Sequence, residues 1–189
     1  YLIIAFCLLC QQFSFGQTIV TEPEEALINL EIEATYSIPS PIETAYRMNA
    51  NGGVFDSHSS NKVSNAEDYR TNITTGLNLG VYCADVSHLI AFKQAIPTPL
   101  IDVLTSLGHR VYAAGFNEEF ASRMQRNPFQ EDALSMILNE AAFMTYDFFE
   151  QNDRGEVNMM IVLGQWIESC YFITNSATSY PSEAMNRMV

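Results

Sequence analysis

Two acidic residues, Asp85 and Glu168, stand out because each lies within a long apolar stretch of the sequence. Burying an ionised carboxylate without a partner costs several kcal/mol, so we expect each side chain to contact a hydrogen-bond donor or to reach a polar cleft. A polar tie between two helices explains both carboxylates without a ligand, and a binding site is the alternative. The candidate donors are Asn78, Tyr82, Trp166, Tyr171, Arg47 and Arg70.

His88 follows Asp85 by three residues, a spacing that places both on one face of a helix. Two such acid-x-x-His pairs on facing helices can hold two metal ions inside a helical bundle. Only one pair occurs here, because Tyr171 stands three residues after Glu168. We therefore interpret Asp85 and His88 as a helix-surface pair and assign no metal, no cofactor and no catalytic residue. The candidate binding residues are Asp85, Glu168, Asn78, Tyr82 and His88.

Motifs typical of enzymes are missing from the sequence. It contains no GxSxG, HExxH, GxGxxG or P-loop pattern. Outside the first ten residues the cysteines are Cys83 and Cys170, and neither belongs to a CxxC or Cys/His cluster. A disulfide between them and two buried free thiols are both compatible with their apolar surroundings. These observations favour a protein without catalytic activity.

The charge of the chain limits its partners. The 189 residues include 9 basic and 22 acidic side chains, for a net charge of −13. Such a surface repels phosphate backbones and anionic membranes, so we expect no binding to nucleic acid. The apolar content of 48% is typical of a folded domain and argues against disorder.

The sequence begins with YLIIAFCLLCQQFSFGQ, whose apolar part is too short for the ~20 residues of a spanning helix. It matches the hydrophobic region of a signal peptide, which has about 7–15 residues. Ser14 and Gly16 form the small-x-small pattern of a cleavage site, so we predict cleavage before Gln17. Lipidation at Cys10 is the alternative. We predict that the protein is exported to the periplasm, the cell envelope or the medium, and that residues 1–16 are an incomplete signal peptide.

Residues 17–36 carry five glutamates and no basic residue, and we expect them to form a flexible acidic leader. Residues 37–189 show no sustained strand pattern, so we predict a single all-α domain of about six helices, mostly antiparallel neighbours. The last predicted helix is cut by the chain end, from which we expect the domain to be incomplete at its C-terminus.

Capping patterns mark the starts of these helices. The predicted starts are Ser40, Ser64, Thr98, Asn117, Asn127, Asp153 and Ser182, and the predicted ends include Gly52, Ala95, Gly108 and Phe149. Gly76, Gly80 and Ala84 recur every four residues and predict a stripe on which another helix backbone approaches closely. The apolar helix over residues 157–176 is expected to lie buried at the centre.

The stretches SIPSPIETA, LNLGVYCADVS and GQWIESCYF resemble a family of exported, often lipid-anchored helical proteins from Bacteroidetes that has no established activity. The similarity runs from about Ser37 to the end of the chain. It implies a helical extracytoplasmic domain and adds no catalytic residue. Cys83 and His88 depart from the family pattern, in which a small residue and a tyrosine are expected.

The sequence thus favours a non-enzymatic interaction or scaffold module of the cell envelope, with an unknown protein or small-molecule partner. The alternative is a small-molecule or metal-binding domain that uses Asp85 and Glu168.

Overall fold

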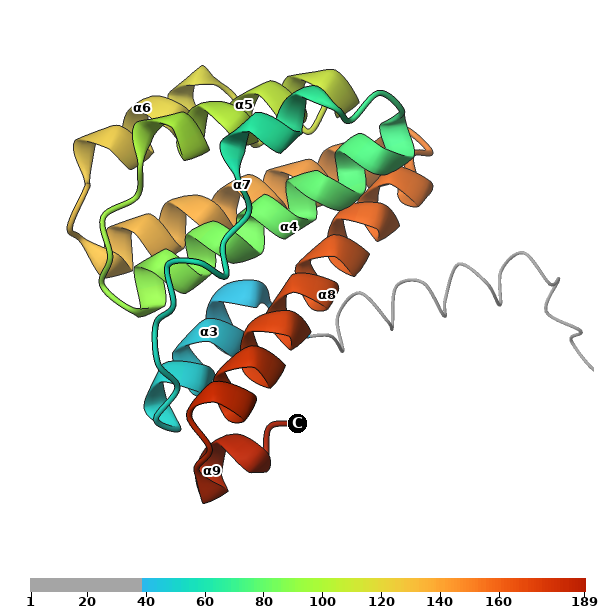
Figure 1. Cartoon of the computed structure of the whole chain (residues 1–189). Helices are drawn as coiled ribbons and strands as arrows, with labels where there is room; N and C mark the ends of the chain where they lie inside the picture. Colours follow the sequence, from blue (N-terminus) through green and yellow to red (C-terminus); the bar gives the residue numbers. More distant parts are fainter. Residues whose placement is uncertain (1–38) are drawn as a thin grey trace, which may run out of the picture. The chain divides into compact units, whose positions relative to one another are not determined.

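Residues 39–189 are described by the computed structural model, which is drawn in Figure 1. A 3-10 helix, η1 (Val63–Glu67), and seven α-helices make up this part of the chain, in which no strand occurs. The α-helices are α3 (Pro41–Ala50), α4 (Asn72–Ala91), α5 (Thr98–Val111), α6 (Glu118–Arg126), α7 (Glu131–Gln151), α8 (Gly155–Ser179) and α9 (Glu183–Asn186). The predicted all-α class is confirmed, whereas the predicted signal peptide and acidic leader lie outside the described residues.

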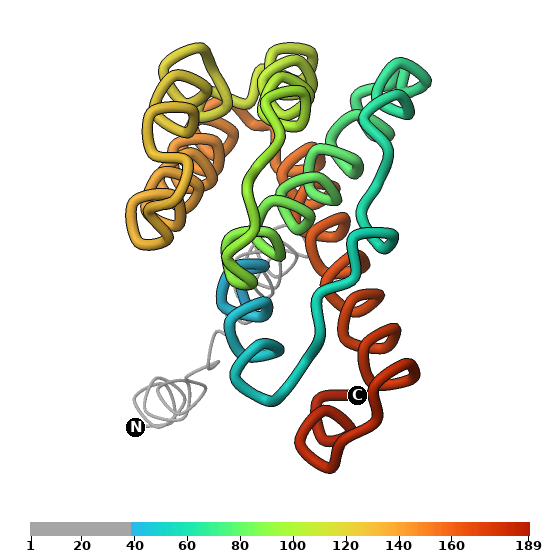
Figure 2. Tube along the Cα trace, turned by 60° about the vertical axis from the view of Figure 1, so that its left-hand side comes forward, coloured from blue at the N-terminus to red at the C-terminus, as the bar shows by residue number. Residues whose placement is uncertain are grey.

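Helix α4 lies at the centre of the domain. Every residue from Leu79 to Ala91 is buried, and the helix contacts α3, α5, α7 and α8 (Figures 1 and 2). A helix that is apolar on all sides belongs in the interior, because any exposed face would leave apolar surface in water. The sequence pattern assigns this central place to residues 157–176. That prediction is wrong, because α8 keeps one face exposed.

The backbones of α4 and α8 touch through glycine. A Cβ atom at Gly80 would overlap the carbonyl oxygen of Ile161, and one at Gly164 would overlap the carbonyl oxygen of Leu77. At Gly76 the contact is looser, since a Cβ there would lie 3.3 Å from the carbonyl oxygen of Val157. The predicted close approach at Gly76 and Gly80 is confirmed. Both helices run in the same direction, so successive turns of α4 face successive turns of α8 (Figure 1).

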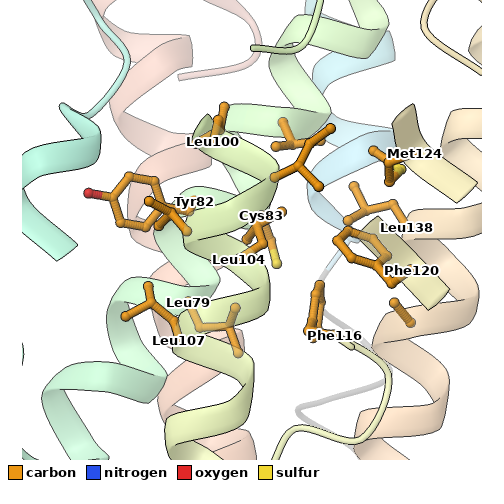
Figure 3. Close-up of a cluster of buried hydrophobic side chains, with 14 of the residues drawn as sticks. Leu79, Tyr82, Cys83, Leu100, Leu104, Leu107, Phe116, Phe120, Met124 and Leu138 are labelled. Carbon is orange, nitrogen blue, oxygen red and sulfur yellow. The ribbon is translucent and has the colours of Figure 1, made fainter. Parts of the chain in front are cut away.

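The main apolar core lies on the other side of α4, where α5, α6 and α7 converge (Figure 3). Its members include Leu79, Tyr82 and Cys83 from α4, Leu100, Leu104 and Leu107 from α5, and Phe116, Phe120, Met124 and Leu138. The leucines of α5 recur at helical spacing, which gives that helix one buried face. Cys83 is a buried free thiol here, and Cys170 is also free.

Several predicted helix starts are confirmed by side-chain caps. The hydroxyl of Ser40 accepts from the backbone N–H of Glu43, and Asn117 Oδ1 accepts from the first turn of α6. The hydroxyl of Ser182 accepts from the N–H of Met185 at the start of α9. Each cap satisfies an N–H group that has no partner within its helix.

Other predicted boundaries are wrong because a stronger cap lies elsewhere. Ser64 lies inside η1, and α4 starts after Thr71, which exchanges backbone-to-hydroxyl bonds with Thr74. Helix α4 ends at Ala91, before the predicted Ala95. Helix α5 passes Gly108 and ends at Val111, and the residue that follows it, Tyr112, has a left-handed φ of 62°.

The predicted starts of α7 and α8 are also wrong. Helix α7 begins at Glu131, beyond the predicted opening at Asn127 and Pro128. Asp153 has a left-handed φ of 53° and does not cap α8, which follows Arg154. In the described part of the chain, no helix has both the length and the apolar character that crossing a membrane requires.

We expect Gly80→Ala to destabilise the domain more than Gly76→Ala. Both substitutions gain up to ~1 kcal/mol of helix propensity. At position 80 the methyl group meets a backbone carbonyl that cannot rotate away, an overpacking that typically costs ~1–3 kcal/mol. At position 76 a small adjustment suffices, because the carbonyl of Val157 is 3.3 Å away. Urea unfolding followed by circular dichroism measures the free energy of unfolding of both variants. Equal losses of stability would contradict the proposed backbone contact.

Candidate functional site

Asp85 and Glu168 meet between α4 and α8 and share one hydrogen-bond donor. The Nδ2 atom of Asn61 lies 3.4 Å from Asp85 Oδ2 and 3.1 Å from Glu168 Oε1. Asp85 is completely buried, and Glu168 is 8% exposed. The two carboxylates singled out from the sequence are therefore a single buried pair.

Asn61 is not among the donors expected from the sequence. It belongs to residues 53–62, here called the strap, which connects the end of α3 to η1 and runs beside α4 and α8 (Figure 2). Its backbone N–H also donates to Asp85, with a distance of 3.2 Å to Oδ2. Asn61 thus offers hydrogens from both its main chain and its side chain to the pair. No local sequence signal distinguishes it from other loop asparagines.

Burial without a cationic partner raises the pKa values of both acids. Desolvation raises the pKa of Asp85 from 3.8 to about 7, and the hydrogen bonds from Asn61 and Ser60 oppose this only in part. Desolvation also raises the pKa of Glu168 from 4.5 to about 7, and the negative charge of Asp85 adds to the shift. None of the ion pairs among the described residues includes either acid. The pair therefore holds protons near neutral pH.

Tyr82, a predicted site residue, lies beside the pair and stabilises the strap. Its hydroxyl donates to the carbonyl of Lys62 at 2.8 Å. Burial raises the pKa of the Tyr82 phenol, and the Asp85 charge contributes. Burial likewise raises the pKa of the Cys83 thiol. Both groups consequently stay protonated around neutral pH.

Two further predicted residues do not join the carboxylates. The side chain of Asn78 donates to the carbonyl of Thr74, one turn earlier in α4. The imidazole of His88 stacks on Phe172, with ring centroids 4.2 Å apart, and on Phe55, at 5.3 Å. Burial lowers the pKa of His88 to about 4, so the ring is uncharged. The interpretation of Asp85 and His88 as a surface pair is wrong, because both side chains are buried.

The other donors considered from the sequence point elsewhere. Arg47 pairs with Glu43 on the surface of α3, and the indole of Trp166 is 51% exposed. Arg70 and Tyr171 likewise make no hydrogen bond or ion pair with either acid, and the neutral amide of Asn61 caps the pair instead.

A polar pocket of about 460 Å³ opens beside the pair. Its lining consists of His58, Ser59, Ser60, Asn61, Lys62, Asn65, Glu168 and Tyr171. Asp85 does not line it, so a solute reaches one carboxylate and is kept from the other by the strap. Within residues 39–189, no group of three or more His, Cys, Asp or Glu side chains is placed to hold a metal ion.

A separate apolar pocket of about 320 Å³ lies between α7 and α8 and shares no lining residue with the polar one. Its walls include Phe143 and Tyr146 of α7 and Ile161 and Val162 of α8. No charged side chain of the described residues lines it, so it carries none of the acid chemistry of the pair.

Comparisons of the chain with protein-family models, with curated proteins and with solved structures find no match.

We expect the stability of the domain to fall as the pH rises through about 7. Because both pKa values are raised from their ordinary 3.8 and 4.5, the folded state binds more protons than the unfolded chain in the interval between. This contribution is fully present at acidic pH and is lost on ionisation of the pair. Between about pH 5 and pH 8 the free energy of unfolding should drop by ~1–3 kcal/mol. Urea titrations at several pH values measure this drop in the free energy of unfolding.

Asp85→Asn should flatten this pH dependence, whereas Asp102→Asn, at an exposed acid of α5, should leave it unchanged. In a double-mutant cycle near pH 8, Asp85→Asn and Glu168→Gln should couple by ~0.5–3 kcal/mol, because either substitution alone removes the repulsion between the acids. Additive single effects, or a wild-type stability that is constant over this range, would contradict the shared buried pair.

Proposed function

We propose that this chain is a non-enzymatic interaction or scaffold module that acts outside the cytoplasm and associates through the outward face of α8. The supporting observation is a stripe of exposed apolar side chains on that helix. Leu163, Trp166, Ile167 and Tyr171 are between 38% and 51% exposed. Their spacing of three, four and eight residues from Leu163 places them along one side of α8.

This stripe carries no charge, although the whole chain has a net charge of −13. The acidic residues of α8 are Glu156, in its first turn, and Glu168, which is buried on the inner side. Large aromatic and aliphatic side chains free of charged neighbours are typical of the centre of a protein interface. Solvation of a monomer alone offers no reason for this composition.

The partner that fits this surface best is a second copy of the chain. The net charge of −13 makes two copies repel each other on average, whereas the two stripes can meet without bringing like charges face to face. A two-fold contact needs only one self-complementary patch, and it is the commonest arrangement of soluble oligomers. Helix α8 has 25 residues and is about 37 Å long, which provides the length for an extended helix-to-helix contact.

Export is supported by the sequence alone. Residues 1–16 have the apolar run and the small-x-small ending of a signal peptide. The resemblance to exported helical proteins from Bacteroidetes points in the same direction. We therefore place the proposed association in the periplasm, at the cell envelope or in the medium.

Residues 17–189 should form a dimer whose stability depends on the stripe. Sedimentation velocity should detect a concentration-dependent dimer of the wild type and a monomer of the variant that combines Trp166→Ser with Ile167→Ser. The matched control is Met136→Ser on α7, where the side chain is 66% exposed but lies off the stripe. A wild type that remains monomeric at high micromolar concentration, or dimers that persist in the stripe variant, would refute homotypic association through α8.

A second candidate function is the binding of a small polar molecule, and the pocket beside Glu168 favours it. The residues that line this pocket include an acid, Glu168, a base, Lys62, and an aromatic residue, Tyr171. A carboxylate and an ammonium across one pocket complement a zwitterion such as a free amino acid. Asp85 would act indirectly, by setting the charge of Glu168.

For this candidate, millimolar alanine should raise the melting temperature of the wild type by several degrees and leave Glu168→Gln unshifted. Ethylamine, which lacks the carboxylate, should give a smaller shift. Absence of a shift with alanine in the wild type, or an equal shift in Glu168→Gln, would rule out a zwitterion site at Glu168.

A further inference from the structure

The strap is held on the α4–α8 seam by polar contacts at both of its ends. Near its start, the N–H of Val54 donates to the hydroxyl of Ser176 at 3.2 Å. Near its end, Asn61 donates to the carboxylate pair. These contacts join the strap to side chains of α4 and α8, so its position depends on the state of those side chains.

The middle of the strap is also tied to α8. Asn175 donates to the Ser59 hydroxyl at 2.7 Å, and this hydroxyl donates in turn to Asp56 Oδ2 at 2.9 Å. The ring of Phe55 covers one side of the His88 imidazole. The closed strap therefore shields both Asp85 and His88, which are 0% and 1% exposed.

Water can hydrate Asp85 only if Asn61 moves. With the strap closed, ionisation of both acids leaves two negative charges facing only neutral donors of the strap, the three hydrogens of Asn61 and the hydroxyl of Ser60. Opening the strap admits water to both carboxylates, which is the solvation that burial denies them. The doubly ionised pair consequently favours the open strap, and a pair that keeps a proton favours the closed one.

We propose that the Asp85–Glu168 pair is a proton-controlled latch: the strap is closed while the pair retains a proton and opens when both carboxylates ionise. This behaviour does not depend on self-association through α8. It makes the exposure of His88 and of the inner side of α8 a function of pH near neutrality.

The neighbouring groups whose pKa values are shifted do not titrate near neutral pH. On α4, Tyr82 and Cys83 have raised pKa values and stay protonated, while His88 has a pKa of about 4 and stays neutral. On α8, Tyr171 borders the pocket. On the strap, hydrogen bonds lower the pKa of Asp56, which stays ionised. The remaining strap groups are His58 and Lys62, and His58 pairs with Asp56 at the surface.

Amide hydrogen exchange tests the latch directly. Between about pH 6 and pH 8, after correction for base catalysis, protection of the Val54 and Asn61 amides should fall at least about tenfold in the wild type. Protection of the α5 core, at Leu104 and Leu107, should change far less. The Asp85→Asn, Glu168→Gln double variant should show constant strap protection over this range.

Acylation of His88 by diethyl pyrocarbonate provides a second readout. With the strap closed, burial lowers the pKa of His88 to about 4 and keeps the ring neutral over this range. An exposed imidazole regains an ordinary pKa, so the acylation rates are divided by the neutral fraction of an exposed histidine before they are read as access. We expect acylation of wild-type His88, resolved by mass spectrometry, to accelerate several-fold from about pH 6 to pH 8. After the same correction, His88 of the Asn61→Ala variant should acylate rapidly at both pH values. His58→Gln and Ser57→Ala, the latter at an exposed strap position, should keep the wild-type response.

Three results would overturn the latch. The first is strap protection that is independent of pH in the wild type. The second is a pH response that persists in the double variant. The third is a parallel loss of protection in α5, which would assign the response to unfolding of the whole domain.

Discussion

The backbone contact between α4 and α8 determines where the buried acids, the strap and the His88 ring lie. Gly80 and Gly164 each lie against a carbonyl of the opposite helix, where any side chain would overlap it. Such a contact fixes the separation of the helices and their register, because sliding by one residue brings a side chain against the opposing backbone. Because the two helices run in the same direction, the pairing of their successive turns continues beyond the glycines. Asp85 and Glu168 meet in the turns after the glycines, and His88 meets Phe172 one turn later.

The same helix register places two acids in one buried space. The type of hydrogen-bond donor that faces them determines their pKa values. An arginine would neutralise one charge and lower both pKa values. Asn61 donates hydrogens without supplying a charge. Desolvation therefore prevails at both acids, the charge of Asp85 adds to it at Glu168, and both pKa values rise to about 7. Replacing the pair by apolar side chains would avoid this cost. What the acids provide instead is an attachment for the strap through Asn61.

The sequence predicted the features that depend on neighbours along the chain. The caps at Ser40, Asn117 and Ser182, and the contact stripe at Gly76 and Gly80, result from local chemistry and helical spacing. Where two caps compete, as Ser64 and Thr71 do before α4, the local pattern cannot rank them. Asp85 and Glu168 were found because a charge in an apolar helix is conspicuous. Asn61 was missed because it lies 24 and 107 positions from its acceptors, in a loop of ordinary polar composition.

Helix α8 has two faces of opposite character, and the strap lies where they meet. Its inner face carries Glu168, and its outer face is uncharged from Leu163 to Tyr171. Apolar composition on both faces explains why the sequence suggested a fully buried helix, although among the helices of residues 39–189 it is α4 that is enclosed, from Leu79 to Ala91. Tyr171 belongs to the outer stripe and also lines the pocket formed by the strap. If the strap leaves Glu168, the surroundings of Tyr171 change at one end of the stripe. Protonation of the buried pair on the inner face of α8 would in that way be coupled to the surface that α8 presents on its outer face.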